Sequence, residues 1–285
     1  MPRTIRTAAA VTAAILAAPA AWAACATDDE VAAFVEAFTA RTPATALGAD
    51  GSMEDARCTQ AKLATAMESE LGPVIGYKAG LTSPPAQERF GVTEPVRGVL
   101  YRDMMLEDGA AVPAAFGIVP FFEADLVMVV GSAAINEAST PEAVMASVSA
   151  IHPFIELPDL MLAQGQPLTG ETITSMGVGP RMGVLGAAIP VEEPAVMAAA
   201  LGSMTVRMTD AAGEVLTEAP GAAVLGHPAQ AVMWLVGDGV TLRPGDLISV
   251  GSFGPLMPPA KAGGEAMVTY LGLPGDPTVR VRFTD

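Results

Sequence analysis

Cationic and aromatic side chains are scarce in this sequence of 285 residues. It has 15 lysines and arginines against 31 aspartates and glutamates, two histidines, and only 5% aromatic residues. The formal net charge is −16 and no stretch gathers basic residues, so a nucleic-acid partner or an anionic membrane partner is not expected. Any small anionic substrate therefore needs a local positive charge, for which the sequence offers few candidates.

The sequence also lacks the motifs of several common enzyme classes. No serine stands in a nucleophile elbow and neither cysteine has a base partner, which excludes hydrolytic triads. The glycines of "GVGPRMG" (177–183) do not have the spacing of a dinucleotide-binding fingerprint. His152 and His227 each precede a proline, and we interpret both as structural imidazoles rather than catalysts.

The N-terminus has the pattern of a secretory signal. Arg3 and Arg6 precede an alanine-rich apolar stretch that ends in "AWA" at Ala23. This pattern predicts a signal peptide over residues 1–23 and a periplasmic or secreted mature protein without membrane association. An uncleaved membrane anchor is the alternative, although the apolar stretch is short for a spanning helix.

Only two cysteines are present, Cys25 and Cys58. In an oxidising compartment they are expected to form one disulfide, and two unpaired thiols are the alternative. A lipid anchor on Cys25 is a lesser alternative, because Trp22 stands where a lipoprotein signal has an aliphatic residue.

The apolar pattern divides the rest of the chain into two parts. Helical spacing over 28–41 and 52–71 predicts an N-terminal helical segment, residues 24–72. From residue 73 to 285, short apolar runs separated by glycine and proline predict many strands, with helices after Thr140, at 194–203 and at 228–238. Because the strands and helices do not alternate regularly, we expect an α+β domain with a mixed sheet.

Two carboxylates begin one of the most apolar runs, "FFEADLVMVVG" (121–131). Glu123 and Asp125 are two residues apart, so in a strand they point to the same face, where like charges require a compensating cation. Glu156, in the short predicted strand "HPFIEL", is the third candidate ligand. Three oxygen ligands suit Mg²⁺ or Mn²⁺ better than zinc. A strand entrance where both acids reach water is the alternative for Glu123 and Asp125.

Lys78 is one of only three lysines and lies inside an apolar segment, "GPVIGYKAGLTS". An ammonium in such a place neutralises a carboxylate or carries a proton, unless the side chain extends to the surface.

Taken together, these stretches resemble the 2-keto-4-pentenoate hydratases of the fumarylacetoacetate hydrolase superfamily. The resemblance lies in "GYKAGLTSPPAQERFGVTEPVRGVLYRDM", "EADLVMVVG", "PFIELPD" and "LRPGDLISVGSFGPLMPPAKAGG", and it covers residues 73–285. It implies a mixed β-sheet roll of the family's C-terminal type, with Lys78 as the active-site lysine. The implied ligands of Mg²⁺ or Mn²⁺ are Glu123, Asp125 and Glu156, and the implied substrate-binding residues are Thr82, Ser252 and Gly254.

The activity implied by the resemblance is hydration of a 2-hydroxydienoic or 2-oxo-enoic acid such as 2-keto-4-pentenoate, by a homo-oligomer acting in the catabolism of aromatic compounds. The sequence departs from the family at Val96 and Arg97 and in the loop 177–181, which bears on the proton relay. Two alternatives therefore stay open. One is decarboxylation or tautomerisation of a 2-oxo diacid, and the other is a non-catalytic periplasmic 2-oxo acid binding protein.

Overall fold

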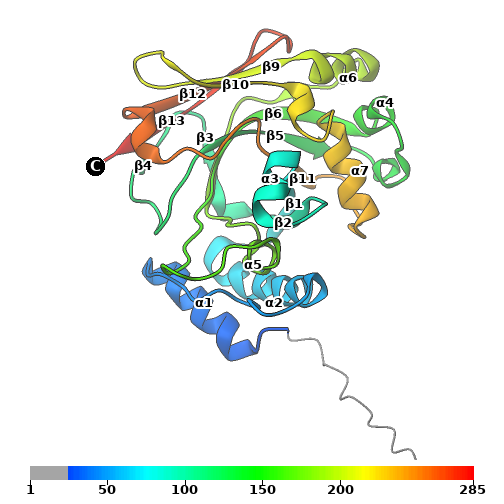
Figure 1. Cartoon of the computed structure of the whole chain (residues 1–285). Coiled ribbons are helices and arrows are strands. Elements are labelled where there is room, and N and C mark those ends of the chain that lie inside the picture. Colours follow the sequence, from blue (N-terminus) through cyan, green and yellow to red (C-terminus); the bar gives the residue numbers. More distant parts are fainter. Residues whose placement is uncertain (1–24) are drawn as a thin grey trace, which may run out of the picture.

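Two mixed β-sheets form the body of the protein, and the computed structural model describes residues 25–285 (Figure 1). The larger sheet has the strand order β2-β1-β11-β5-β6-β7-β3, with β8 paired to β6. Its strands are β1 (Val74–Gly80), β2 (Val96–Tyr101), β3 (Met105–Glu107), β5 (Glu123–Val130), β6 (Val148–Leu157), β7 (Met182–Leu185), β8 (Ile189–Pro190) and β11 (Leu247–Ser249).

The smaller sheet has the order β10-β9-β12-β13-β4. Its strands are β4 (Ala110–Pro113), β9 (Thr205–Thr209), β10 (Val215–Pro220), β12 (Glu265–Leu271) and β13 (Thr278–Thr284). The pairs β1–β11, β3–β7 and β4–β13 are parallel and the other pairs are antiparallel, so the predicted α+β fold with mixed sheets is confirmed. Tyr270 on β12 joins the two sheets, because its buried hydroxyl contacts the backbone of Asp125 and Phe154.

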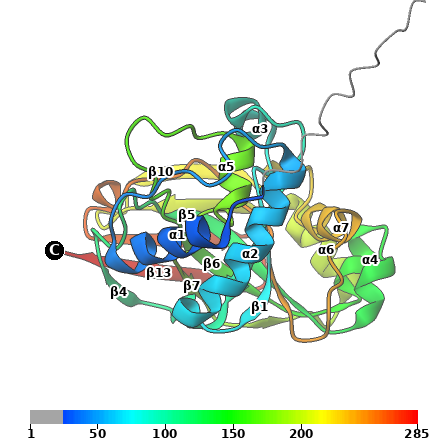
Figure 2. The same ribbon diagram turned by 90° about the horizontal axis from the view of Figure 1, so that it is seen from below.

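The helices lie around these sheets. α1 (Asp28–Ala40), α2 (Met53–Leu71) and α5 (Gly170–Ser175) form a layer at one end of the molecule, and α4 (Pro141–Met145), α6 (Pro194–Ser203) and α7 (Ala229–Gly237) cluster on one side (Figures 1 and 2). The short helix α3 (Pro84–Phe90) follows β1. Among residues 25–285, no helix combines the length and apolar character that a membrane span requires.

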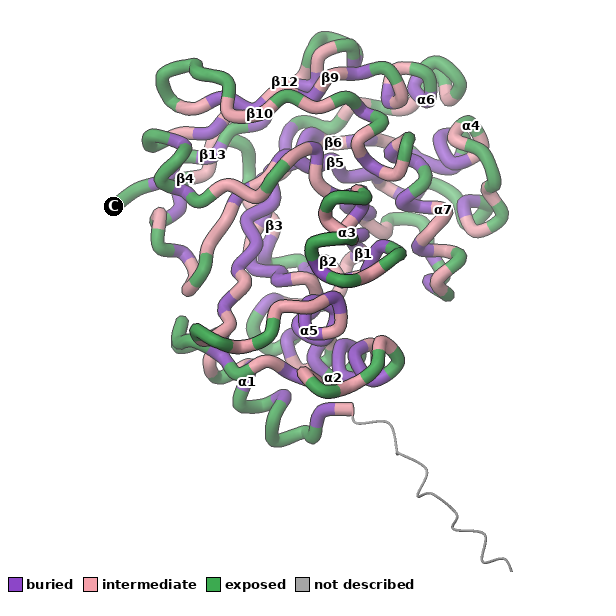
Figure 3. The backbone as a smooth tube through the Cα atoms, in the orientation of Figure 1, coloured by how far each residue is buried: buried purple, intermediate pink, exposed green. Residues whose placement is uncertain are grey.

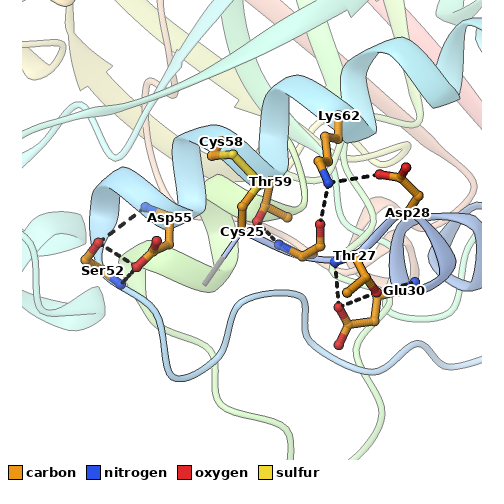
Figure 4. The surroundings of a disulfide bond; sticks show 10 residues. Cys25, Thr27, Asp28, Glu30, Ser52, Asp55, Cys58, Thr59 and Lys62 are labelled. Atoms are coloured by element: carbon orange, nitrogen blue, oxygen red, sulfur yellow. Dashed lines mark hydrogen bonds and ion pairs between the residues drawn. A yellow bond between two sulfur atoms is a disulfide. The ribbon is translucent and has the colours of Figure 1, made fainter. Parts of the chain in front are cut away.

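The start of α1 is fastened to α2 by several bonds (Figure 4). Cys25 and Cys58 form a disulfide across a Cα–Cα distance of 5.5 Å, which confirms the predicted pairing. Beside it, the amide of Ala26 donates to Thr59 Oγ1 over 2.9 Å, and Lys62 Nζ lies 2.9 Å from a carboxylate oxygen of Asp28. These contacts fix the otherwise free N-terminal end of α1.

The N-terminal helices share a hydrophobic core with the rest of the chain. Phe34 and Phe38 of α1 and Met67 of α2 are buried in the same cluster as Met161 and Ile173, and the tube in Figure 3 is largely buried where these elements meet. The helical segment is therefore packed onto the rest of the chain and has no separate core.

A buried arginine adds a polar connection to this interface. Arg181 Nε lies 2.9 Å from Asp159 Oδ2, and Arg181 Nη2 donates to the carbonyl of Phe38 over 3.1 Å. The guanidinium also lies 3.9 Å from the centroid of the Phe38 ring. Arg181 thus connects α1 to the loop after β6.

Candidate active site

Strand pairing brings two of the three predicted ligands together. β5 and β6 are antiparallel neighbours, and their register places Glu123 opposite Glu156 and Asp125 opposite Phe154. Residues directly opposite in such a pair point to the same face, so the side chains of Glu123 and Glu156 enter one volume. This juxtaposition joins residues that are far apart in the sequence.

That volume is a cavity of about 490 Å³, here called the central cavity. Its polar lining includes Glu123, Glu156 and Lys78, together with Thr82, Ser252 and Gly254, so the structure gathers six of the seven predicted site residues. It is also lined by apolar side chains and by one arginine that the sequence analysis did not single out: Leu81, Arg89, Phe90, Leu160, Ile173, Val178 and Leu256.

Lys78 is fully buried and does not extend to the surface. Its side chain is 2% exposed, it forms an ion pair with Glu156, and it donates to the carbonyl of Val178 over 3.1 Å. Gly98 on β2 lies beside it, and a Cβ at that position would stand 2.9 Å from Lys78 Cγ. The ammonium is therefore held in one position by two acceptors and a close backbone.

The loop 177–179 supplies one of those acceptors through an unusual backbone. Gly177, Val178 and Gly179 all have positive φ angles, of 70°, 63° and 64°. A β-branched residue in this region is strained, at a cost on the order of 1–3 kcal/mol. The conformation directs the Val178 carbonyl to Lys78. The sequence signal for this conformation is the pair of glycines around Val178.

Asp125 does not line the central cavity. Its carboxylate accepts hydrogen bonds from the hydroxyl of Ser249, from the amide of Gly251 over 2.9 Å and from its own neighbour Leu126 over 2.6 Å. These bonds attach β5 to β11 and to the loop that carries Ser252. Ser249 is a second residue that the sequence analysis missed.

Burial and neighbouring negative charge raise the pKa values of Glu123 and Asp125. Burial, followed by repulsion from Glu156, raises the pKa of Glu123 well above its usual range. The same two causes raise the pKa of Asp125 to about 7, although the hydrogen bonds from Ser249 and Leu126 act in the opposite direction. Lys78 compensates only part of this negative charge, so the site favours an additional cation.

A divalent metal fits two of these residues better than the third. Glu123 and Glu156 offer buried carboxylate oxygens to the central cavity, which is the donor chemistry of a hard cation. Asp125 is directed at other partners, and within residues 25–285 no three His, Cys, Asp or Glu side chains are arranged to hold a metal ion. The assignment of all three as ligands stays a prediction.

The remaining predicted residues have defined surroundings. Thr82 is buried beside Gly251, and Ser252 Oγ donates to the carbonyl of Gly254 over 2.6 Å. The two histidines make hydrogen bonds to backbone, as expected of structural imidazoles. His152 Nδ1 lies 2.8 Å from the carbonyl of Gly186, and His227 Nε2 lies 2.9 Å from that of Ala198.

Comparison with known proteins identifies the family. Residues 94–282 match the model described as "Fumarylacetoacetate (FAA) hydrolase C-terminal", and the chain belongs to this family. It is 32% identical to a 2-keto-4-pentenoate hydratase of Paraburkholderia xenovorans over 73% of this chain and 77% of the relative. It is also 29% identical to a 2-hydroxyhexa-2,4-dienoate hydratase of Comamonas testosteroni, over 82% and 87%. The predicted recognition and the prediction of an enzyme of the hydro-lyase type are thereby confirmed.

Solved structures share the fold. The 4-oxalocrotonate decarboxylase from Pseudomonas putida G7, complexed with magnesium and adipate, has a TM-score of 0.75 at 23% identity and covers 90% of this chain and 97% of its own. The fumarylpyruvate hydrolase from Pseudomonas aeruginosa, in complex with Mn²⁺ and pyruvate, has a TM-score of 0.54 at 17% identity, covering 74% and 91%. At these identities the likeness shows the fold alone.

The prediction of a periplasmic or secreted protein is wrong. The relatives that the chain matches are cytoplasmic enzymes of aromatic catabolism. Residues 1–23, on which the signal-peptide prediction rests, lie outside the described residues. A short basic and alanine-rich stretch is a pattern of composition only, and it does not by itself determine where a protein is located. The predicted homo-oligomer stays a prediction.

Proposed function

We propose that this protein is a divalent-metal-dependent hydratase that adds water to a 2-hydroxydienoic acid such as 2-hydroxypenta-2,4-dienoate, the enol form of 2-keto-4-pentenoate. The observation that carries the proposal is the buried Lys78–Glu156 pair beside Glu123 in the central cavity. A cation, a proton donor and two carboxylates at one place are what enolate chemistry on a 2-oxo acid requires. Curated relatives that are hydratases support the reaction type.

Glu123 and Glu156 are the residues that would hold the metal, with Asp125 as the third, weaker candidate. Bound there, Mg²⁺ or Mn²⁺ would supply a Lewis acid for the carboxylate and 2-oxo oxygen atoms of the substrate. Glu123 is buried next to another carboxylate, and the Lys78 ammonium offsets only part of that repulsion, so it gains most from a cation. Asp125 acts mainly by holding β11 and the Gly251–Ser252 loop.

Lys78 is the residue that moves the proton. Its ammonium is buried against Glu156 and the Val178 carbonyl, and it is the only lysine in the lining of the central cavity. Because Glu156 and Val178 fix the direction of its N–H bonds, it can donate to a substrate carbon or hold a water molecule in place. Thr82 and Ser252 provide hydroxyl groups for the substrate in the same lining.

The test is turnover by the purified protein supplied with Mg²⁺ or Mn²⁺. We expect loss of the dienol absorbance of 2-hydroxypenta-2,4-dienoate, with 4-hydroxy-2-oxopentanoate identified as product by NMR. Lys78→Ala is expected to abolish turnover and to leave metal binding largely intact, whereas Lys62→Ala, on the exposed side of α2, is the matched control and keeps activity.

Other outcomes would contradict the proposal. Release of CO₂ from a 2-oxo diacid without hydration of dienoates would favour a decarboxylase. Saturable binding of pyruvate or oxalate without turnover of any dienoate or 2-oxo diacid would favour a binding protein.

A further inference from the structure

Gln60 is a buried glutamine on α2 that joins two backbone segments far apart in the sequence. Its Nε2 group donates to the carbonyl of Arg97 on β2 and, over 2.8 Å, to the carbonyl of Thr174 on α5. Both partners are acceptors, so the two hydrogens of one amide nitrogen are used at the same time. This arrangement, here called the Gln60 bridge, ties β2 to α5 at one separation.

The first of these segments lies against the stem of Lys78. β2 is antiparallel to β1, with Gly98 opposite Lys78, and Gly98 directly follows Arg97. A Cβ at position 98 would stand 2.9 Å from Lys78 Cγ, so the β2 backbone lies very close to the lysine side chain. The bond from Gln60 to the Arg97 carbonyl therefore fixes β2 one residue away from this contact.

The second segment carries an acceptor of the Lys78 ammonium. The Thr174 carbonyl accepts from Gln60 and also from the amide of Gly177, over 3.0 Å. Gly177 begins the stretch of positive φ in which Val178 gives its carbonyl to Lys78. A β-branched residue keeps such a backbone only where its surroundings fix it, and the Gln60 bridge fixes the start of this turn.

Gln60 itself does not belong to the lining of the central cavity. It lies in the N-terminal helical segment, outside residues 94–282 that match the family model. α2 reaches the site because it packs against both α5 and β2 (Figures 1 and 2). An effect of Gln60 on the reaction must therefore pass through Lys78 and not through a contact with substrate.

We propose that Gln60 is a positioning residue for Lys78, and that the N-terminal helices are for this reason part of the scaffold of the active site. The Gln60 bridge holds the two backbone segments that enclose the lysine, and so keeps its ammonium directed into the central cavity. Under the proposed function, on which the kinetic part of this inference rests, a displaced Lys78 transfers its proton more slowly although metal and substrate still bind.

The first test measures the accessibility of Lys78 without any substrate. The chain has three lysines, and the exposed Lys62 and Lys261 serve as internal standards for timed acylation with an amine-reactive ester, followed for each peptide by mass spectrometry. Gln60→Met keeps the volume of the side chain and removes both donors. We expect acylation of Lys78 to be at least about 10-fold faster in this variant, with unchanged rates at the other two lysines.

The second test is kinetics with Mg²⁺ and 2-hydroxypenta-2,4-dienoate. Gln60→Met should lower kcat at least about 10-fold and leave KM and the Kd of Mg²⁺ within about 2-fold, since only the chemical step loses its positioned lysine. Gln60→Asn keeps the amide on a shorter stem that cannot reach both acceptors, and it should change kcat in the same direction.

Thr59→Val is the matched control. Thr59 is also buried on α2, but its hydroxyl accepts from the amide of Ala26 and makes no bond toward the site. This variant should lower stability and leave both kcat and the acylation rate of Lys78 unchanged.

Three results would overturn the inference. Acylation of Lys78 in Gln60→Met at the rate of the unmodified protein would show that the glutamine only fills space. Equal acceleration in Thr59→Val would show that general loosening of α2 exposes the lysine. A raised KM with an unchanged kcat would show that Gln60 acts on substrate binding. If the unmodified protein turns over no dienoate, the proposed function fails, and the acylation rates alone then uphold or overturn the inference.

Discussion

Replacing Arg181 with methionine is expected to destabilise the protein by about 3 kcal/mol. The side chains of Arg181 and Asp159 are 8% and 1% exposed, so the substitution leaves a carboxylate buried without its cation. Breaking a buried pair in this way typically costs about 3–5 kcal/mol. The lower end applies here, because Asp159 keeps the hydrogen bonds from the amides of Ile118, Val119 and Met161.

Urea unfolding at 25 °C measures this effect. With a slope of about 3 kcal/mol per molar for a chain of this size, the midpoint should fall by roughly 1 M at an unchanged slope. Arg207→Met is the matched control, because Arg207 pairs with Glu218 at 42% and 47% exposure, and it should change stability by less than about 1 kcal/mol. A midpoint for Arg181→Met that equals the control would refute a stabilising role for the buried pair.

Three further predictions concern the disulfide, the lysine and the carboxylates. Cys58→Ser opens a loop with a sequence separation of 33 and should lower stability by up to roughly 3–4 kcal/mol, measured by thermal unfolding against the oxidised protein. Gly98→Ala should displace Lys78 and the loop 177–179, since the added Cβ would stand 2.5 Å from the carbonyl oxygen of Gly177 and 2.9 Å from Lys78 Cγ. We expect kcat to fall at least 10-fold, with circular dichroism as the check that the variant is folded. Glu123→Gln should weaken Mg²⁺ binding at least 10-fold in calorimetry, and Asp125→Asn should weaken it less, because Glu123 lines the central cavity and Asp125 does not. An equal loss of Mg²⁺ affinity in both variants would contradict Asp125 as the weaker ligand.

The sequence predicted those parts of the site that depend on strand alternation and on a recognisable set of segments. Glu123 and Glu156 could be singled out because each stands in an apolar run with strand character, and the pairing of β5 with β6 places them opposite one another. The hydrogen bonds of the Asp125 carboxylate to Ser249 and Gly251 could not be predicted from the sequence. They form only because β11 lies beside β5 in the sheet, although the two strands are far apart in the sequence.

Helix α3 was missed although its local signals are present. Ser83 stands at the N-cap position, two prolines begin the helix and Gly91 follows it with a φ of 71°. Seven residues are too few for an apolar period to be visible, so the stretch was not assigned as a helix. Arg89 was therefore not considered as a residue of the site, and its place there became evident only from the lining of the cavity.

The loop 177–181 connects the site to the N-terminal helices. Within five residues, Val178 presents its carbonyl to Lys78 and Arg181 binds Asp159 and the carbonyl of Phe38 on α1. The strained φ of Val178 persists only where the surroundings fix the backbone, and the buried Arg181 pair is such a constraint. The buried Arg181 pair thus supports the loop that holds the lysine, so Arg181 contributes to the position of Lys78 as well as to the attachment of α1.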